Sequence, residues 1–462
     1  MLHALSHLFF ASISCIPLHL SLSYFYLKST VINMENSNLQ KYFDLDSQNS
    51  DIFDQFKDLP GITPEVRDMW VLPENNQKTT TPAVSIELFS DPIASAIQTN
   101  CPAEIEKRKK HENSENLTID DNGIRALIKD NCYRSALSLT SRLLSNYGQG
   151  LKSGQEIKHS KHSLQLWYTR IYLLIKINEL EIARKESEAF GQLNNADMFY
   201  EFTEEQAYKS KKGSLPNFAF RLLLSYELPF KLNRSREALQ NLVTILANTR
   251  KIHKFFRDLN KLTEAEFWKE REIRVLCSII NCATHLKNFD LINQIFDNLL
   301  LLPDLKEDFK FELYSAWGRI HLQCGDISTA EKKFNTIPSV NPKHELIALV
   351  NKGLLAVAQN DYNEAHNLFQ QAHELDKNNV MILNNLAVCF LYNGKMHEAI
   401  AIYESAIKND PRNNLHPTTL LNCATLYELQ SNESKKKKID LLKIVSANRA
   451  DLEMNIDACL KL

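Results

Sequence analysis

The sequence predicts an all-α protein in which helix pairs stack into a solenoid, preceded by a disordered amino-terminal region. The chain holds only 11 glycines in 462 residues, whereas about 7% is usual, which argues against a β-barrel or an enzyme built on glycine-rich dinucleotide loops. From about residue 117 onward, almost every segment has the hydrophobic period of an amphipathic helix. In addition, small and aromatic residues recur in this part of the chain at a spacing of 34 to 35 residues.

Charge and cysteine content narrow the class of protein further. Lysine and arginine number 54 against 56 aspartates and glutamates, for a net charge of -2. This balance argues against a dedicated nucleic-acid-binding protein, which usually has a strongly basic face. The nine cysteines form no C-x-x-C pair and no zinc-type spacing with histidine. We therefore expect free thiols in a reducing compartment, with no metal and no cofactor.

Residues 1–33 are rich in leucine, phenylalanine and serine. A signal peptide needs a basic segment ahead of its apolar stretch, but no Lys or Arg precedes Lys28. We expect residues 1–33 to be an upstream extension, with Met34 as the working start. A hydrophobic leader or membrane anchor is the alternative, and mass spectrometry of the endogenous chain would test it.

Residues 34–116 are acidic, polar and contain several prolines, so this region is expected to be disordered. Isolated apolar islands interrupt it, such as Met69-Trp70-Val71-Leu72. Such islands either act as short docking motifs for a partner or pack on the chain's own helical domain.

The repeat is clearest around Ala330, Ala365 and Ala399, which are spaced 35 and 34 residues apart. An aromatic residue follows each alanine by four positions, and a small residue precedes each on the first helix of its pair. Glycine also recurs in two of the turns between paired helices, where it can adopt a left-handed conformation. These recurring residues are Phe334, Phe369 and Tyr403 (aromatic), Gly318, Gly353 and Ala387 (small), and Gly325 and Gly394 (turn).

This pattern resembles the tetratricopeptide repeat, in which small residues let the two helices of a pair lie close together. Residues 311–413 are expected to form clear repeats and residues 117–310 degenerate ones. Residues 414–462 are expected to form capping helices that lack the signature. The prediction is about seven helix pairs in one α-solenoid.

No catalytic motif is present in the sequence. The glycines at 148, 150 and 154 fit neither the Walker nor the dinucleotide spacing. Cys282, Cys389 and Cys423 fall at the same repeat position, where buried packing is a commoner use than metal binding. The run Lys435–Lys438 is expected to be a solvated loop, with a membrane-phosphate or nuclear-import role as the alternative. We expect the protein not to be an enzyme.

The concave face of such a solenoid is lined by fixed positions of each first helix, and here it is rich in apolar residues. Contiguous apolar surface tends to mark a partner site, and amides can hold a bound backbone. The alternative is that the chain's own amino-terminal segment fills this groove. The predicted protein-binding residues are Val350, Leu354, Val357, Met381, Asn384, Asn385, Val388 and Tyr392.

Several stretches resemble the subunit-twelve family of the trafficking protein particle (TRAPP) complex. They include Ser163–Trp167, Gly318–Lys332, Asn384–Lys395 and the terminal Cys459–Leu462. The resemblance covers about residues 117–462 and implies a non-enzymatic tethering-complex subunit in transport from the endoplasmic reticulum to the Golgi. It further implies other subunits of that complex as partners, above all the large ones, and no nucleic acid. The implied location is cytoplasmic, with peripheral membrane association through the complex at the Golgi and the intermediate compartment.

The alternative function is a tetratricopeptide co-chaperone or adaptor that binds a peptide segment of another partner. A co-chaperone that captures a carboxyl terminus needs a Lys-x3-Asn clamp on a first helix. Lys352 is followed four residues later by Ala356, and Lys343 by Ile347, so this clamp is missing.

Overall fold

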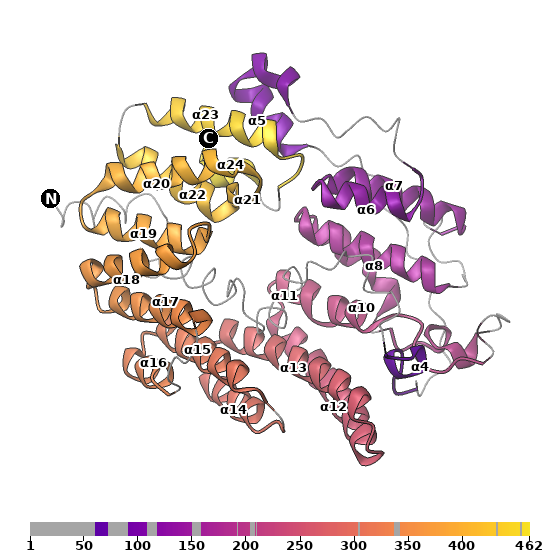
Figure 1. Cartoon of the computed structure of the whole chain (residues 1–462). Helices are drawn as coiled ribbons and strands as arrows, with labels where there is room; N and C mark the ends of the chain where they lie inside the picture. Colours follow the sequence, from indigo (N-terminus) through magenta and orange to yellow (C-terminus); the bar gives the residue numbers. More distant parts are fainter. Residues whose placement is uncertain are drawn as a thin grey trace. The chain divides into compact units, whose positions relative to one another are not determined.

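The computed structural model describes residues 61–72, 91–108, 118–149, 159–191, 193–203, 208, 210–303, 305–336, 342–430, 433–452 and 455–462. Across these residues the fold is helical and contains no strand (Figure 1), with Phe199 and Ser214 forming a single isolated bridge. The predicted leader, residues 1–33, lies outside the described residues. In the part of the chain described, no helix combines the length and hydrophobicity needed to cross a bilayer.

The described residues fall into two compact units. The amino-terminal unit contains residues 61–295 together with 446–456, and the carboxyl-terminal unit contains residues 296–445 together with 457–462.

The carboxyl-terminal unit is built from successive antiparallel helix pairs. Its helices are α15 (Glu307–Gln323), α16 (Ile327–Phe334), α17 (Pro342–Ala358), α18 (Tyr362–Leu375), α19 (Val380–Tyr392), α20 (Met396–Asn409), α21 (Pro411–Asn414) and α22 (Pro417–Gln430). Most of α23 (Ser434–Asn448), the end of α14 (Phe289–Leu300) and most of α24 (Ile456–Leu460) also belong to it. Each first helix packs on the second helix of its own pair.

The predicted repeat register is confirmed by the packing. A Cβ atom added at Gly318 would lie 2.4 Å from the Phe334 ring, and one at Gly353 would lie 2.7 Å from the Phe369 ring. These glycines therefore let the first helix of each pair contact the aromatic residue of the second. The three frame alanines at 330, 365 and 399 are fully buried. The turn glycines at 325 and 394 adopt positive φ angles of 79° and 77°.

The amino-terminal unit contains most of residues 117–310, for which the sequence predicts degenerate repeats. Its helices are α6 (Asp121–Lys129), α7 (Tyr133–Asn146), α8 (Lys161–Lys176), α9 (Leu180–Ser187), α10 (Phe218–Leu222), α11 (Leu228–Lys231), α12 (Ser235–Asp258) and α13 (Leu262–His285), and it includes the start of α14. A π-helical turn, Leu223–Glu227, joins α10 to α11. Helices α12 and α13 have 24 residues each, which makes them far longer than the 14 residues of α18 or α20.

Part of the region expected to be disordered is instead ordered. Residues 61–72 contain α4 (Pro64–Arg67), and residues 91–108 contain α5 (Pro92–Asn100) and a 3-10 helix (Pro102–Lys107). The other residues of 34–116 lie outside the described part of the chain. The physical reason for the order is that these apolar islands bury themselves on the chain's own helices.

The contacts of the segment 61–72 show how this docking works. The Trp268 indole donates to the Val66 carbonyl oxygen at 3.1 Å, and the Arg271 guanidinium donates to the Arg67 carbonyl oxygen at 2.7 Å. The Trp70 ring lies 6.5 Å from the Trp268 ring. The apolar island around Trp70 therefore packs on the chain's own domain, which was one of the two alternatives left open by the sequence.

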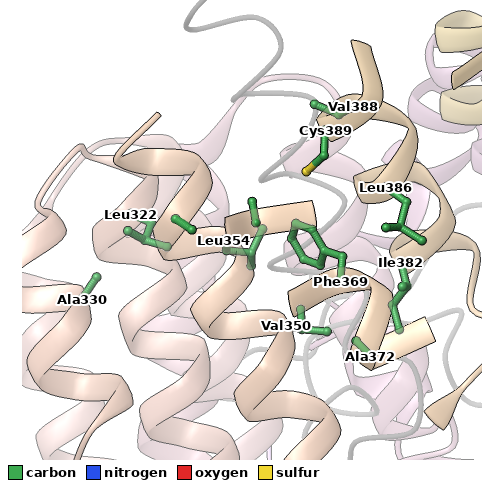
Figure 2. Close-up of a cluster of buried hydrophobic side chains, with 12 residues drawn as sticks. Leu322, Ala330, Val350, Leu354, Phe369, Ala372, Ile382, Leu386, Val388 and Cys389 are labelled. Atoms are coloured by element: carbon green, nitrogen blue, oxygen red, sulfur yellow. The ribbon is translucent and has the colours of Figure 1, made fainter. Parts of the chain in front are cut away.

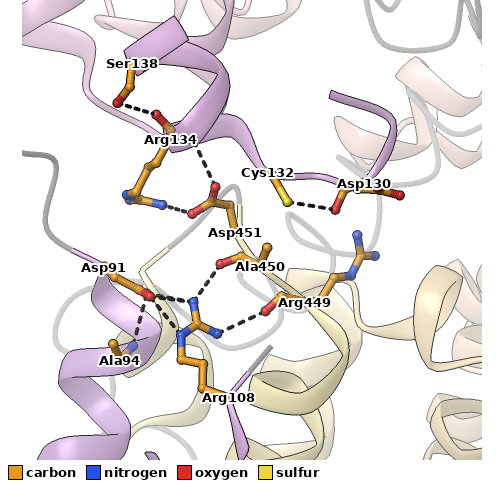
Figure 3. A network of polar contacts seen from close by, with 10 residues as sticks. All are labelled: Asp91, Ala94, Arg108, Asp130, Cys132, Arg134, Ser138, Arg449, Ala450 and Asp451. Carbon is orange, nitrogen blue, oxygen red and sulfur yellow. Dashed lines mark hydrogen bonds and ion pairs between the residues drawn. The ribbon is translucent and has the colours of Figure 1, made fainter. Parts of the chain in front are cut away.

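Residues 446–456 are held in the amino-terminal unit by two arginines (Figure 3). Arg108 pairs with Asp91 at 2.7 Å and also donates to the carbonyl oxygens of Arg449 and Ala450. Arg134 pairs with Asp451, whose side chain is fully buried. The segment after α23 therefore belongs to the packing of helices far ahead of it in the sequence.

Candidate functional site

The predicted groove residues lie on α17 and α19, the first helices of two consecutive pairs in the carboxyl-terminal unit. Figure 2 shows several of them within one cluster of buried side chains that includes Phe369, Ile382 and Leu386. The repeat therefore brings these side chains together, as the sequence predicts. Their exposure, however, differs from one residue to the next.

Val350, Leu354 and Val388 belong to the hydrophobic core of this unit. Their exposed fractions are 2%, 3% and 8%, so they join neighbouring helix pairs and offer little surface. The sequence pattern marks them as concave-face positions without distinguishing a residue covered by its neighbours from one open to a partner.

Val357, Met381 and Tyr392 are half-buried and pack on the edge of the same cluster. The Tyr392 ring stacks on the Tyr362 ring of α18, with centroids 4.2 Å apart and an interplanar angle of 3°. Burial raises the pKa of the Tyr392 hydroxyl, so this side chain stays neutral and can donate a hydrogen bond. These three residues provide the accessible apolar surface among the predicted set.

Asn384 is not free to hold a bound backbone through its oxygen. Its Oδ1 accepts from the Tyr403 hydroxyl at 2.8 Å and from the Asn422 amide at 2.7 Å. Tyr403 lies on α20 and Asn422 on α22, so Asn384 links α19 to both of these helices. Its role in this structure is internal.

Asn385 differs from its neighbour. It is 1% exposed, and among the described residues neither Oδ1 nor Nδ2 has a hydrogen-bond partner. A buried amide without partners costs free energy, and such a group in a native fold calls for an explanation.

The preceding repeat explains why Asn385 is unpaired. Asn351 occupies the equivalent position on α17, and its Oδ1 accepts from Arg319 Nε at 2.8 Å and from Ser315 Oγ at 3.1 Å, both on α15. One repeat later, the positions of Ser315 and Arg319 are taken by Val350 and Leu354. Since both replacements are apolar, Asn385 keeps the amide but has lost the two groups that would satisfy it.

Sequence reasoning missed the roles of Ser315 and Arg319. Arg319 is 2% exposed, and burial lowers the pKa of its guanidinium to about 10. The available signal was an arginine at a groove position of α15, one helix before an asparagine on α17. Reading each groove position across neighbouring repeats, rather than along one helix, would have found it.

Two other sequence features have structural roles. Cys282, Cys389 and Cys423 are fully buried, and burial raises their thiol pKa values to about 12, 12 and 11. The lysine run at 435–438 was expected in a loop but lies at the start of α23. Lys438 is buried and pairs with Glu428 at 2.6 Å, because an ammonium removed from water needs a carboxylate beside it.

The comparison with protein families agrees with this fold. The family model for the tetratricopeptide repeat matches residues 350–414, which contain α18, α19 and α20. A solved tetratricopeptide-repeat protein from Parabacteroides merdae has a TM-score of 0.34 and 16% identity, over 52% of this chain and 96% of that one. The match to the family model and the successive helix pairs together show a tetratricopeptide α-solenoid.

Two curated relatives are similar over most of the chain. Trafficking protein particle complex subunit 12 of Mus musculus is 35% identical over 359 residues, which is 74% of this chain and 44% of the relative. The Homo sapiens protein of the same name is 34% identical over 359 residues, which is 74% of this chain and 48% of the relative. The resemblance inferred from the sequence is confirmed, and the chain spans slightly less than half the length of these relatives.

Proposed function

We propose that this chain is a non-enzymatic scaffold subunit of a vesicle-tethering complex that acts between the endoplasmic reticulum and the Golgi. The observation that carries the proposal is the similarity to trafficking protein particle complex subunit 12 over about three quarters of the chain. In this proposal the protein is cytoplasmic and reaches the membrane of the Golgi and the intermediate compartment through the complex. Its partners are other subunits, above all the large ones.

The proposed assembly surface is the part of the groove between α17 and α19 that is accessible or unsatisfied. Val357, Met381 and Tyr392 offer apolar contact, and burying such surface contributes about 25 cal/mol per Å2. Asn385 adds one donor group and one acceptor that no described residue uses. An extended segment of a partner subunit can satisfy both with its backbone, because a peptide unit carries one N–H and one C=O. Access to Asn385 requires a local opening, since the residue is 1% exposed.

The chemistry of this surface supports binding rather than catalysis. An amide, two aliphatic side chains and a neutral phenol hold a segment in place, but they supply no activated nucleophile and no acid–base pair.

The experiment is affinity capture of the full chain from its native cell, followed by mass spectrometry of the co-purifying proteins. The test variant is Met381→Ala with Tyr392→Ala, which spares the fully packed Leu354. The matched control is Leu375→Ala on α18, where an apolar side chain is 51% exposed outside the groove. We expect tethering-complex subunits with the wild type and the control, and their loss with the test variant at unchanged helical content.

The possible failures point to different errors. If the wild type captures no tethering-complex subunit, the proposed function is wrong, and capture of a chaperone instead would favour the adaptor alternative. If the double variant retains the subunits, the function stands but the groove is not the assembly surface.

A further inference from the structure

The helical hairpin of α12 and α13 extends well beyond the length that a repeat requires. Its 24-residue helices are about 36 Å long, compared with about 21 Å for a 14-residue second helix. Within the amino-terminal unit the closed end of the hairpin projects away from α10 and α11 (Figure 1). The connecting turn is tight, with Asn260 at a φ angle of 53°.

The segment 61–72 stabilises the hairpin just short of its closed end. Val66 packs in one cluster with Ile252 and Phe256 of α12 and with Ala265 and Trp268 of α13. Beyond Phe256 and before Ala265 no residue of the hairpin is buried. The hairpin is therefore anchored by this cluster up to Phe256 and Ala265. The turn beyond them is exposed, and no described residue covers it.

This exposed end carries large apolar side chains. Phe255, Leu259 and Leu262 are 47%, 52% and 78% exposed. Phe255 lies in the last turn of α12, and Leu259, four residues later, directly follows the helix with its N–H donating to the Phe255 carbonyl oxygen. The two side chains therefore lie on the same side of the helix end, while Leu262 begins α13. We call these three residues, together with the basic residues around them, the hairpin tip.

The basic residues of the hairpin tip are Lys251, Lys254, Arg257 and Lys261, and all four are exposed. Within the described residues none of them forms an ion pair. Residues 251–262 contain one carboxylate, that of Asp258, against these four cations. The acidic residues of α13 begin at Glu264, and the nearby Glu266 is paired with Lys269. Positive charge is thus concentrated on the end of α12 and on the turn.

We propose that the hairpin tip binds directly to an anionic phospholipid surface. The three apolar side chains enter the headgroup region, and the four cations interact with lipid phosphates and carboxylates. Apolar side chains at the end of a projecting hairpin, beside three lysines and an arginine that form no ion pair within the described residues, match the two components of such a surface. The inference goes beyond the proposed assembly function and does not depend on the groove, which lies in the other unit.

A protein partner is the competing occupant, and one observation points to where it would sit. A shallow pocket of about 540 Å³ lies beside the tip, lined by Ile62, Leu262, Thr263, Glu266, Phe267 and Glu270. The carboxylates of Glu266 and Glu270 give this pocket a negative charge, which would attract a basic segment of a partner protein. The α12 side of the tip is instead positively charged. The convex shape and the positive charge of the tip itself favour lipid.

The test measures co-sedimentation of the purified full chain with vesicles of two compositions. One is phosphatidylcholine alone, and the other contains about one-fifth phosphatidylserine. We expect binding only to the anionic vesicles, weakened by salt. Lys254→Gln with Lys261→Gln should lower the partition coefficient about 25-fold, because each basic residue near such a surface contributes about fivefold. Phe255→Ser with Leu259→Ser and Leu262→Ser should abolish binding.

Matched controls use exposed residues of the same unit away from the tip. Lys129→Gln with Lys212→Gln removes the same charge, and Val243→Ser removes an apolar side chain that is 55% exposed on α12. Both controls should bind like the wild type, and circular dichroism should show every variant folded. The proposal is overturned if the wild type fails to bind anionic vesicles, or if the lysine control weakens binding as much as the tip variant. It is also overturned if a photo-crosslinker at position 259 captures a protein and no lipid in cells.

Discussion

Replacing Asn385 by leucine should make the protein more stable and, at the same time, weaken its binding to partner subunits. Leucine has the same branching at Cγ as asparagine, with methyl groups in place of the amide oxygen and nitrogen. Asn385 is 1% exposed and its amide has no partner among the described residues. The substitution removes no hydrogen bond within this part of the chain.

The expected gain is the desolvation penalty of an unpaired buried polar group, about 1–3 kcal/mol. For a unit of this size, each kcal/mol raises the melting temperature by about 2–4 °C. The matched control is Asn351→Leu at the equivalent position of the previous repeat. Its Oδ1 accepts from Arg319 Nε at 2.8 Å, so that variant should lose about 1.5–3 kcal/mol because it removes a hydrogen bond to a buried charged group.

Stability is best measured by hydrogen exchange of the amides in α19, which reports the opening of this unit separately from the other. Binding is measured by affinity capture from the native cell. We expect slower exchange and fewer captured subunits for Asn385→Leu, which is the trade-off seen when a binding group is replaced by a better packing group. Faster exchange would refute the claim that the amide is unpaired. Slower exchange with normal capture would show that partners do not use Asn385.

Three further predictions concern packing, pH and the carboxyl-terminal segment. Ala399→Leu, at a fully buried frame position, should overpack the pair α19–α20 and cost about 1–3 kcal/mol; an unchanged thermal melt would contradict the repeat register. Burial lowers the pKa of His159 to about 4, below the 6.5 of an unfolded histidine, so below pH 6.5 the unfolded state binds a proton that the native state does not. Stability should therefore fall by about 2 kcal/mol between neutral pH and pH 5, and urea titrations of His159→Phe should lack that component. Asp451→Ala leaves the Arg134 guanidinium without its buried carboxylate and should destabilise the amino-terminal unit by about 3–5 kcal/mol, whereas a loss below about 1 kcal/mol would indicate that water replaces the pair.

The features that the sequence predicts well are those that recur in successive helix pairs. Ala365 and Gly353 occupy crossings where only a small residue fits, so spacing alone reveals them. Features that occur once are different, because they depend on which residues meet across repeats. The contact between Val66 and Trp268 joins positions about two hundred residues apart, and no local sequence pattern predicts it.

The candidate site shows the same limit on a smaller scale. Groove positions can be located by counting along α19. However, of the two adjacent asparagines there, one has hydrogen-bond partners and the other has none among the described residues. Asn384 has partners on α20 and α22, whereas Asn385 faces a repeat in which Val350 and Leu354 stand where Ser315 and Arg319 stood one repeat earlier. Which amide is satisfied is therefore decided by the neighbouring repeat and not by its own helix.

The position of residues 446–456 has a consequence for how the protein is made. At about 5–20 residues per second, the ribosome needs some tens of seconds to travel the 317 positions from Arg134 to Asp451. Throughout that interval the nascent amino-terminal unit lacks the carboxylate and the two backbone carbonyl groups that later surround its arginines. The unit made first is thus completed by the residues made last, so a nonsense or frameshift mutation near the end of the gene would damage the beginning of the protein. Chaperones would be expected to hold the growing chain until its final residues emerge.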